Sequence, residues 1–316
     1  MIAFFPSAYP DELLYSVLAR YHLRSGYARY VSTAEDIYQT GKVTNPSIEF
    51  VNKYTDDVMA WLTKDVPWKT VAEKHTMYPA YIRFLPLLKR KEAVDGVIVQ
   101  DGNWKNLMHL RASDEKRYLR YCPICAEEDR EKYGETYWHR GHQIPRIRVC
   151  HKHGVFLASS IIPIASKTSP GLFDAQSNVP EATAVRYCEN DREMAFTKYV
   201  IDVFNTSIDI ETNFNIGTYL QSHIPSKYQD KTGLMTDISK FYSAYAAFYD
   251  GLPAIPKTYM QKIFNGYIYD TYYILQLAFF EGLSVHEITC IPATTSTTDL
   301  GGLYSHLSEN IISNII

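Results

Sequence analysis

The chain carries two short sequences that decide the fold of its middle part, RYCPIC at residues 120–125 and VCHKHG at residues 149–154. Cys122 and Cys125 are separated by two residues, and the same spacing recurs between Cys150 and His153. A Cys-x-x-Cys turn aims two sulfur atoms at one point, and a second pair of ligands completes the tetrahedron that zinc prefers. We therefore predict one zinc ion (Zn²⁺) held by these four residues.

Three thiolates and one imidazole fill all four positions of such an ion, so the predicted metal is structural and not catalytic. His151, His139 and His142 are alternatives to His153 for the fourth position. A module of this size lacks a sufficient core of its own, and metal binding supplies its folding energy. The residues around the ligands, about 120–160, are expected to form turns and short strands.

The composition of the 316 residues, with 46% hydrophobic and 14% aromatic residues, indicates a globular protein. The longest apolar stretches are too short to span a bilayer. The start of the chain has no basic region followed by an apolar one, which predicts a protein of the bacterial cytoplasm without a secretion signal. Five cysteines are an odd number, and they favour metal binding over a disulfide framework.

Charge is distributed unevenly along the chain. Residues 1–189 carry three more Lys and Arg than Asp and Glu, whereas residues 190–316 carry six fewer. An acidic C-terminal third is poorly suited to covering DNA phosphates over a wide surface.

The apolar periodicity predicts a mainly α fold with a small zinc-held module of short strands and turns. We divide the chain into an N-terminal helical region (1–115), the zinc-binding module (116–162), a linker (163–188) and a C-terminal helical domain (189–316). Helices are predicted at 10–25, 33–39, 46–62, 67–75, 191–204, 233–249, 257–264 and 271–280, with a short one from 284. The last two, joined at Gly282, resemble a helix-turn-helix, although ordinary helical packing explains the same pattern.

Two passages resemble the TniQ/TnsD family of transposition target-selection proteins. The first is PDELLYSVLAR at residues 10–20, and the second combines RYCPIC with GETYWHR at 134–140, QIP at 143–145 and VCHKHG. The order, spacing and residue types of the second passage match the zinc segment of the family. The resemblance covers about residues 6–160 closely and the remainder only in its helical character.

This resemblance implies a non-enzymatic adaptor of DNA transposition. Such a protein recognises a target, either double-stranded DNA directly or a guide-RNA effector complex, and recruits an AAA+ ATPase transposition regulator (TnsC-like). It is expected to be associated with the nucleoid when active. Some members carry a second zinc site, but here Cys188 has no Cys-x-x-Cys partner nearby. The chain length and the apolar end IISNII at 311–316 predict the N-terminal part of a longer, TnsD-like protein.

Basic residues within and next to the zinc module are candidates for DNA contact. No acidic residue occurs between Glu135 and Asp174. A metal-held frame would fix cationic side chains there in positions that suit phosphate groups. The candidates are Arg140, Arg146, Arg148 and Lys152.

Arg20 and Arg24 lie one turn apart on the first predicted helix, away from its apolar stripe. They are expected either to contact a partner protein, the ATPase in the family's case, or to pair with carboxylates such as Glu12 or Asp11. Both alternatives remain open at this point.

Two further classes of function compete with the adaptor. Gly141-His142-Gln143-Ile144-Pro145 is similar to one step of HNH-type metal-dependent nucleases, but His151 and His153, the nearest candidates for a second catalytic residue, fall in the predicted zinc site. A scaffold that binds only proteins and never contacts DNA is the other alternative, and the acidic C-terminal third favours it.

Overall fold

The structure is a computed structural model that describes residues 2–41, 46–99, 117–164, 171–229 and 237–294. It is mainly helical, as predicted, with one two-stranded sheet in the described part of the chain. The apolar segment 311–316 lies outside the described residues. No helix among these residues is long and apolar enough to cross a bilayer.

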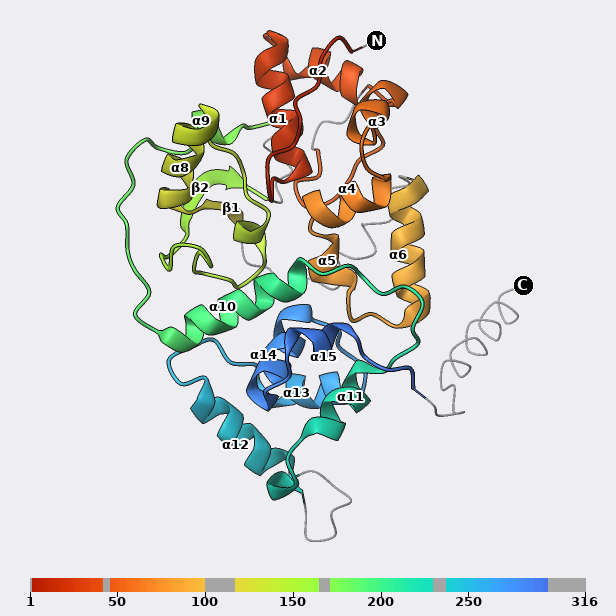
Figure 1. Cartoon of the computed structure of the whole chain (residues 1–316), viewed down its shortest axis with the longest axis vertical. Helices are drawn as coiled ribbons and strands as arrows, with labels where there is room; N and C mark the ends of the chain where they lie inside the picture. Colours follow the sequence, from red (N-terminus) through yellow and green to blue (C-terminus); the bar gives the residue numbers. More distant parts are fainter. Residues whose placement is uncertain (1, 42–45, 100–116, 165–170, 230–236, 295–316) are drawn as a thin grey trace, which may run out of the picture.

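The N-terminal region is a group of short helices in the upper part of the molecule (Figure 1). They are α1 (Leu14–Ser25), α2 (Tyr30–Ile37), α3 (Asp56–Leu62), α4 (Trp68–His75), α5 (Tyr78–Ile82) and α6 (Leu87–Val99). Gly26 ends α1 in the left-handed region at φ 72°, where glycine is favoured. The helix predicted over 46–62 is shorter, because residues 46–55 are non-helical and Tyr54 forms an isolated bridge with Tyr38.

The acidic pair Asp11 and Glu12 does not open the first helix, contrary to the sequence-based expectation. The helix begins at Leu14, Asp11 has a positive φ of 55°, and Glu12 forms an isolated β-bridge with His139. Both carboxylates instead meet arginine side chains, which stabilise them more strongly than a helix dipole would.

The predicted zinc module contains the sheet, in which β1 (Tyr118–Tyr121) pairs antiparallel with β2 (Ala158–Pro163). It also contains α8 (Pro123–Tyr133), the 3₁₀-helix η2 (Gly141–Gln143) and, nearby, α9 (Ala175–Asn178). The expectation of turns and short strands missed the eleven-residue helix α8. Its sequence lacks an apolar stripe, and its capped start at Cys122 and glycine stop at Gly134 decide its extent.

The C-terminal region consists of α10 (Asp191–Phe204), α11 (Ile216–His223), η3 (Ser226–Tyr228), α12 (Ile238–Phe248), α13 (Lys257–Phe264), α14 (Thr271–Glu281) and α15 (Val285–Thr289). α10 and α13 have the predicted bounds, while α11 was missed. α14 and α15 are joined through Gly282, in the left-handed region at φ 80°, and Ser284 caps α15. The predicted helix–turn–helix order is therefore present locally, and its role in DNA binding stays a prediction.

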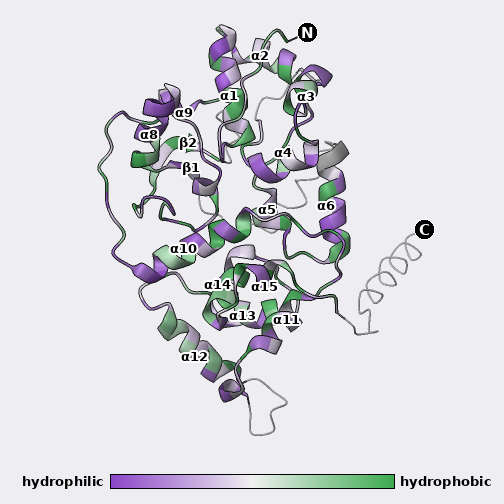
Figure 2. Ribbon diagram, in the orientation of Figure 1, coloured by the Kyte–Doolittle hydropathy of each residue, from purple (hydrophilic) through white to green (hydrophobic). Residues whose placement is uncertain are grey.

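Helix α10 lies between the upper and lower parts of the molecule and contacts α14 and α15 (Figure 1). Its hydrophilic start at Asp191 gives way to hydrophobic residues towards its end (Figure 2). One cluster of buried apolar side chains extends from Phe5 to Ile291. Residues of the predicted linker also join it, since Leu172 and Val179 are buried. The division into four segments stays a prediction, and the segments share a continuous core.

Candidate metal centre and its buried ion pairs

The first pair of candidate ligands lies where β1 meets α8. Cys122 follows β1 and is the N-cap of α8, and its Sγ accepts the backbone N–H of Cys125 at 3.4 Å. Pro123 occupies the first helical position, where no N–H donor is needed. The start of the helix therefore holds both sulfur atoms on one side of a single turn.

The second pair lies in a tight turn closed by Gly154. The bridge between Val149 and Phe156 brings the two arms of the turn together. The N–H of Gly154 donates to the Cys150 carbonyl at 2.9 Å, with Gly154 at φ 65°. A side chain at this position would be strained in the left-handed region and would also meet Met194.

Four of the six distances between the ligand atoms fit a tetrahedron, and all four atoms lie within 4.8 Å of one another. Cys125 Sγ and Cys150 Sγ are 3.7 Å apart. His153 Nδ1 lies 3.4 Å from Cys122 Sγ, 3.3 Å from Cys125 Sγ and 3.7 Å from Cys150 Sγ. Zinc bonds of about 2.0–2.3 Å in tetrahedral geometry place ligand atoms roughly 3.5–3.8 Å from one another. The four residues could thus hold one ion.

The surroundings of this cluster favour a closed site. Cys122 and Cys150 are fully buried and pack with Val155 in a small apolar cluster. Hydrogen bonds from the Cys122 and Cys125 thiols lower the pKa of the Cys150 thiol. The other ring nitrogen of His153, Nε2, lies 3.2 Å from Glu128 Oε1, and such a carboxylate orients a ligating histidine.

The three alternative histidines lie outside the cluster. His151 is exposed. His139 Nε2 is 2.9 Å from Asp129 Oδ2. Burial lowers the pKa of His139, but the hydrogen bond with Asp129 and the nearby negative charges outweigh it, so the pKa is raised overall. His142 is buried in η2, only 3% exposed. Among the described residues, the group that could hold a metal consists of the four residues predicted from the spacing.

A second feature of the site is a buried ion-pair network that joins α1 to the module. Arg20 donates from Nε to Glu12 Oε1 at 2.9 Å and from Nη2 to Glu12 Oε2 at 2.7 Å. Its Nη1 also donates to Glu135 at 3.2 Å, and Arg24 pairs with the same carboxylate. The predicted pairing of Arg20 with Glu12 is confirmed, while partner contact by either arginine stays a prediction.

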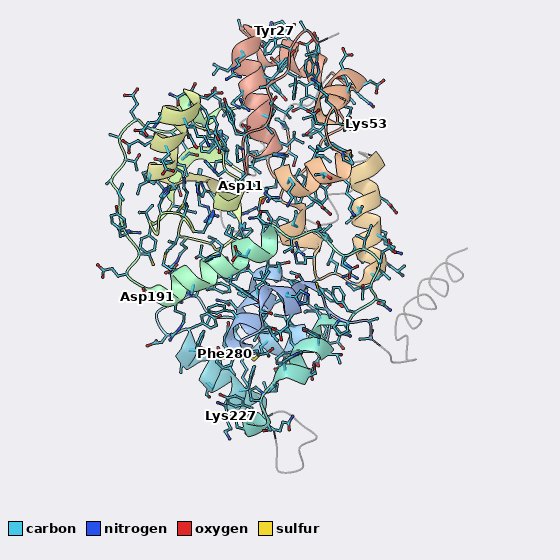
Figure 3. The ribbon with its side chains drawn as sticks, in the orientation of Figure 1. Asp11, Tyr27, Lys53, Asp191, Lys227 and Phe280 are labelled. Carbon is cyan, nitrogen blue, oxygen red and sulfur yellow. The ribbon has the colours of Figure 1, made fainter. Side chains whose placement is uncertain are left out.

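Asp11 forms the other ionic link, at the junction of the N-terminal helices with the module (Figure 3). Its Oδ1 accepts Arg140 Nε at 3.2 Å and its Oδ2 accepts the Gly141 N–H at 2.9 Å. Arg140 is 1% exposed, donates to Asn205 Oδ1 at 2.6 Å and stacks on the Phe204 ring at 4.2 Å. Arg140 therefore ties together the N-terminal segment, the module and the end of α10.

Neutral contacts reinforce this junction. The Trp138 N–H donates to Ser16 Oγ at 3.1 Å, and the Leu13 N–H donates to the Trp138 carbonyl at 2.9 Å. Gln143, fully buried, bonds through its amide to the backbone of Arg120 and His139. Sequence reasoning singled out neither Ser16 nor Gln143 as structural residues. Their positions could have indicated this role, because both lie within the two passages that resemble the TniQ/TnsD family.

The remaining candidates for DNA contact each have an acidic partner. Arg146 pairs with Asp270 at 3.0 Å and lies over the Tyr273 ring. Arg148 pairs with Glu193 at 2.8 Å, and Lys152 pairs with Glu128. The side chains of Arg148 and Lys152 are 45% and 59% exposed, respectively. Of the four candidates these two are the accessible ones, and phosphate contact stays a prediction for all four.

The four candidate metal ligands and most of the ion pairs lie within a segment that matches a known family. Residues 3–157 match the family model described as TniQ, so this part of the chain is a TniQ domain. The resemblance predicted from the two sequence passages is confirmed. The chain is also similar to the Transposon Tn7 transposition protein TnsD of Escherichia coli, at 26% identity over 162 residues. That match covers 48% of this chain and 31% of the length of the relative.

Proposed function

We propose that this protein selects the target of a DNA transposition reaction and acts as an adaptor without a chemical step of its own. It would bind target DNA or a target-recognition complex, such as a guide-RNA effector, and recruit an AAA+ ATPase regulator of the transposase. The observation that carries this proposal is the TniQ match over residues 3–157 together with the likeness to TnsD.

The proposed cofactor is one structural zinc ion on Cys122, Cys125, Cys150 and His153. The donor set and the tetrahedral spacing support it. When bound, the ion supplies a cross-link between the start of α8 and the turn before Gly154. The chain then uses that cross-link to hold Glu135 and Arg140 against the N-terminal segment.

For DNA contact we propose Arg148 and Lys152 as the main phosphate ligands among the four predicted residues. Both are exposed, and an exposed ion pair contributes only about 0–1 kcal/mol, so a DNA phosphate can replace its carboxylate. Arg140 is proposed to act indirectly, by holding the module in place. For the ATPase contact we propose Arg24, because its side chain is 42% exposed whereas that of Arg20 is 2% exposed.

A DNA-binding titration tests the phosphate contacts. The full chain would be mixed with duplex DNA over a range of salt concentrations. Each phosphate contact contributes about 0.9 to the slope of log K against log salt, so Arg148→Ala/Lys152→Ala should lower the slope by roughly 2. Lys198→Ala is the matched control, since Lys198 is an exposed cation paired with Asp202 on α10. An unchanged slope in the double variant would remove these residues from the proposal.

Recruitment is tested separately, on immobilised target DNA. The AAA+ regulator encoded with the same transposon should be retained on DNA only when this chain is present. Arg24→Glu should reduce the retained ATPase while leaving DNA binding unchanged. Retention that is independent of the chain would contradict the adaptor role.

A scaffold that contacts only proteins is the second candidate, and one observation favours it. Arg140, Arg146, Arg148 and Lys152 all have carboxylate partners within the chain. Absence of measurable DNA binding, combined with capture of the ATPase, would select this candidate. The nuclease alternative has less support, because the buried His142 would have to reach a phosphodiester bond from inside the protein.

A further inference from the structure

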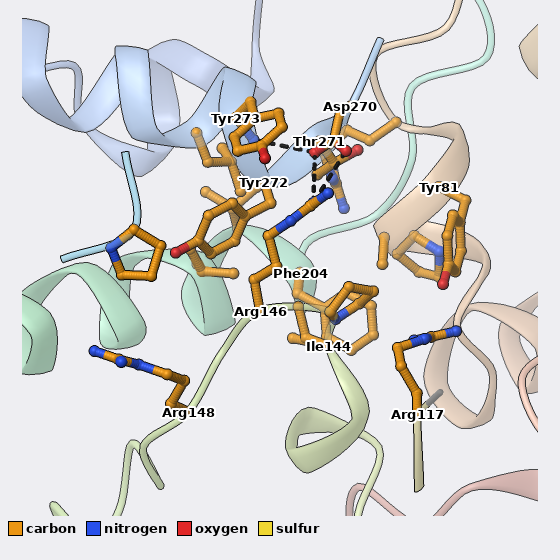
Figure 4. Close-up of a pocket in the computed structure, with 18 of the residues that line it drawn as sticks. Tyr81, Arg117, Ile144, Arg146, Arg148, Phe204, Asp270, Thr271, Tyr272 and Tyr273 are labelled. Carbon is orange, nitrogen blue, oxygen red and sulfur yellow. Dashed lines mark hydrogen bonds and ion pairs between the residues drawn. The ribbon is translucent and has the colours of Figure 1, made fainter. Parts of the chain in front are cut away.

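A cavity of about 470 Å³ lies between the TniQ domain and the C-terminal helices (Figure 4). Its walls come from β1, the loop after η2, α5, α10 and the start of α14. Ligand sites for small molecules typically measure about 300–1,000 Å³, so one small molecule would fit here. None of the four candidate metal ligands lines this cavity, so a metal ion at that site would not fill it.

The walls carry more positive than negative charge. Within the part of the chain that the structure describes, five arginine side chains line the cavity: Arg83, Arg117, Arg120, Arg146 and Arg148. Three of them have carboxylate partners, namely Glu49 for Arg117, Asp270 for Arg146 and Glu193 for Arg148. The hydrogen bonds that the structure gives for the other two end on backbone carbonyls, at Thr206 and Ser207 for Arg83 and at Ile144 and Ile147 for Arg120.

Burial makes this excess charge costly. Arg83 is 4% exposed, and desolvation lowers its pKa to about 10, which still leaves it charged at neutral pH. Desolvation and the nearby Arg117 likewise lower the pKa of Arg120 to about 10. Glu73 near Arg83 and Glu49 near Arg120 raise these pKa values, but burial remains the largest influence on both. Because burying a cation is costly, an anion in the cavity would stabilise both arginines further.

Polar atoms that have no hydrogen-bond partner among the described residues lie on the same walls. They are Arg83 Nε, Arg117 Nη1 and Thr271 Oγ1, all buried. Thr271 is the first residue of α14, an eleven-residue helix whose positive dipole end therefore meets the cavity. Three unused donors beside a helix N-terminus match the acceptor oxygens of a phosphate group.

Aromatic rings complete the cavity. Tyr81 faces it from α5, and Tyr272 and Tyr273 face it from α14, with Phe204 at the end of α10 (Figure 4). Rings of this kind stack on nucleobases, and each such contact is worth about 1–3 kcal/mol. Arg146 already lies over the Tyr272 and Tyr273 rings. A bare inorganic anion would contact the arginines alone, whereas a nucleotide would engage both the rings and the arginines.

We propose that this cavity binds a single nucleoside monophosphate, with the phosphate at Arg83, Arg117 and Thr271 and the base between the tyrosine rings. A phosphate monoester carries about −1.5 to −2 charges at pH 7, close to the excess of two guanidinium groups over carboxylates. The nucleotide is either free or the 5′-terminal residue of a DNA strand, since both present the same chemistry. This site goes beyond the adaptor function and does not depend on it.

Calorimetric titration of the zinc-loaded full chain with 5′-AMP tests the proposal. We expect one AMP per chain, with adenosine and inorganic phosphate each binding at least tenfold more weakly. Phosphate binding as tightly as AMP would mean a general anion site and would overturn the proposal. So would a lack of AMP binding at millimolar concentration, or binding of a glutamate-rich peptide in place of AMP.

Two variants locate the site. Glu49→Gln/Arg117→Gln removes a donor without leaving a buried lone carboxylate, and Thr271→Val removes one hydroxyl at nearly constant shape. The first should weaken AMP binding at least tenfold and the second about threefold, with thermal unfolding confirming that both variants fold. Arg29→Gln, at an exposed arginine outside the cavity, should have no effect. Unchanged AMP binding in both cavity variants would refute the assignment.

The source of the nucleotide is distinguished by competition. An oligonucleotide with a 5′ phosphate should displace AMP, and its 5′-hydroxyl counterpart should not, if the ligand is a DNA end. Failure of both oligonucleotides to displace bound AMP would identify a free nucleotide as the ligand. Displacement by both equally would contradict recognition of the phosphate monoester.

Discussion

Replacing Arg20 by methionine should destabilise the protein strongly. Arg20 is 2% exposed, and it makes a bidentate ion pair with Glu12, which is fully buried. Methionine retains much of the side-chain volume but leaves Glu12 without its cation. Breaking a buried pair in this way typically costs about 3–5 kcal/mol in the free energy of unfolding, because the remaining charge is desolvated and unpaired.

The loss should depend on pH in a defined direction. Burial is the largest influence on the pKa of Glu12 and raises it, while Arg20 lowers it. Without Arg20 the folded state holds a proton on Glu12 at a pH where the unfolded chain has released it. The stability of Arg20→Met should therefore fall as pH rises from the ordinary glutamate range and recover partly in acid.

Urea unfolding of the zinc-loaded protein, followed by circular dichroism, measures both effects. Arg20→Met/Glu12→Gln should recover a large part of the lost stability, since no buried charge is left unpaired. Arg24→Met is the matched control on the same helix. The Arg24 side chain is 42% exposed, and Glu135 keeps its ion pair with Arg20, so the loss should be no more than about 1 kcal/mol. A loss below 1 kcal/mol in Arg20→Met, or a double variant no more stable than the single one, would refute the reasoning.

Three further predictions concern other parts of the chain. Cys122→Ser should lower the zinc content from one ion per chain towards zero and unfold residues 120–160; metal analysis and hydrogen exchange would measure this, and full zinc retention would contradict it. Glu281→Gln should raise the free energy of unfolding at pH 8 but not at pH 4. Burial raises the pKa of Glu281, neither of its carboxylate oxygens has a hydrogen-bond partner among the described residues, and the folded state therefore loses stability as pH rises. Gly217→Ala should destabilise the protein by about 1–3 kcal/mol in the same urea assay, because a Cβ there would lie 2.4 Å from the Phe264 carbonyl of α13; an unchanged midpoint would exclude this close packing.

Short-range patterns in the sequence predicted several features correctly. Helices α10 and α13 follow from apolar periodicity, and the asparagine cap of α10 comes just before it. The four metal-ligand candidates follow from two pairs with two-residue spacing, because the geometry of a tight turn is set by neighbouring residues. The family follows from the order of residues in two passages, and the TniQ match confirms it.

Other features could not be predicted in this way. Helix α8 carries no apolar stripe, so apolar periodicity could not predict it. It is stabilised instead at its two ends and by contacts such as that of Arg130 with Gln176. Arg140 was named as a candidate for DNA contact because it lies among other basic residues. It is buried because Asp11, 129 residues away, and Asn205 meet it in the folded chain.

The sequence by itself thus determined the local elements of this protein, namely its main helices, the two turns of its candidate metal site and its resemblance to the TniQ family. The tertiary structure decided which charges are neutralised, which cations remain exposed, and where an arginine-lined cavity forms. The physical reason is the range of the interactions involved. Turn geometry and helical periodicity depend on residues a few positions apart, whereas desolvation and ion pairing depend on which distant segments the fold brings into contact.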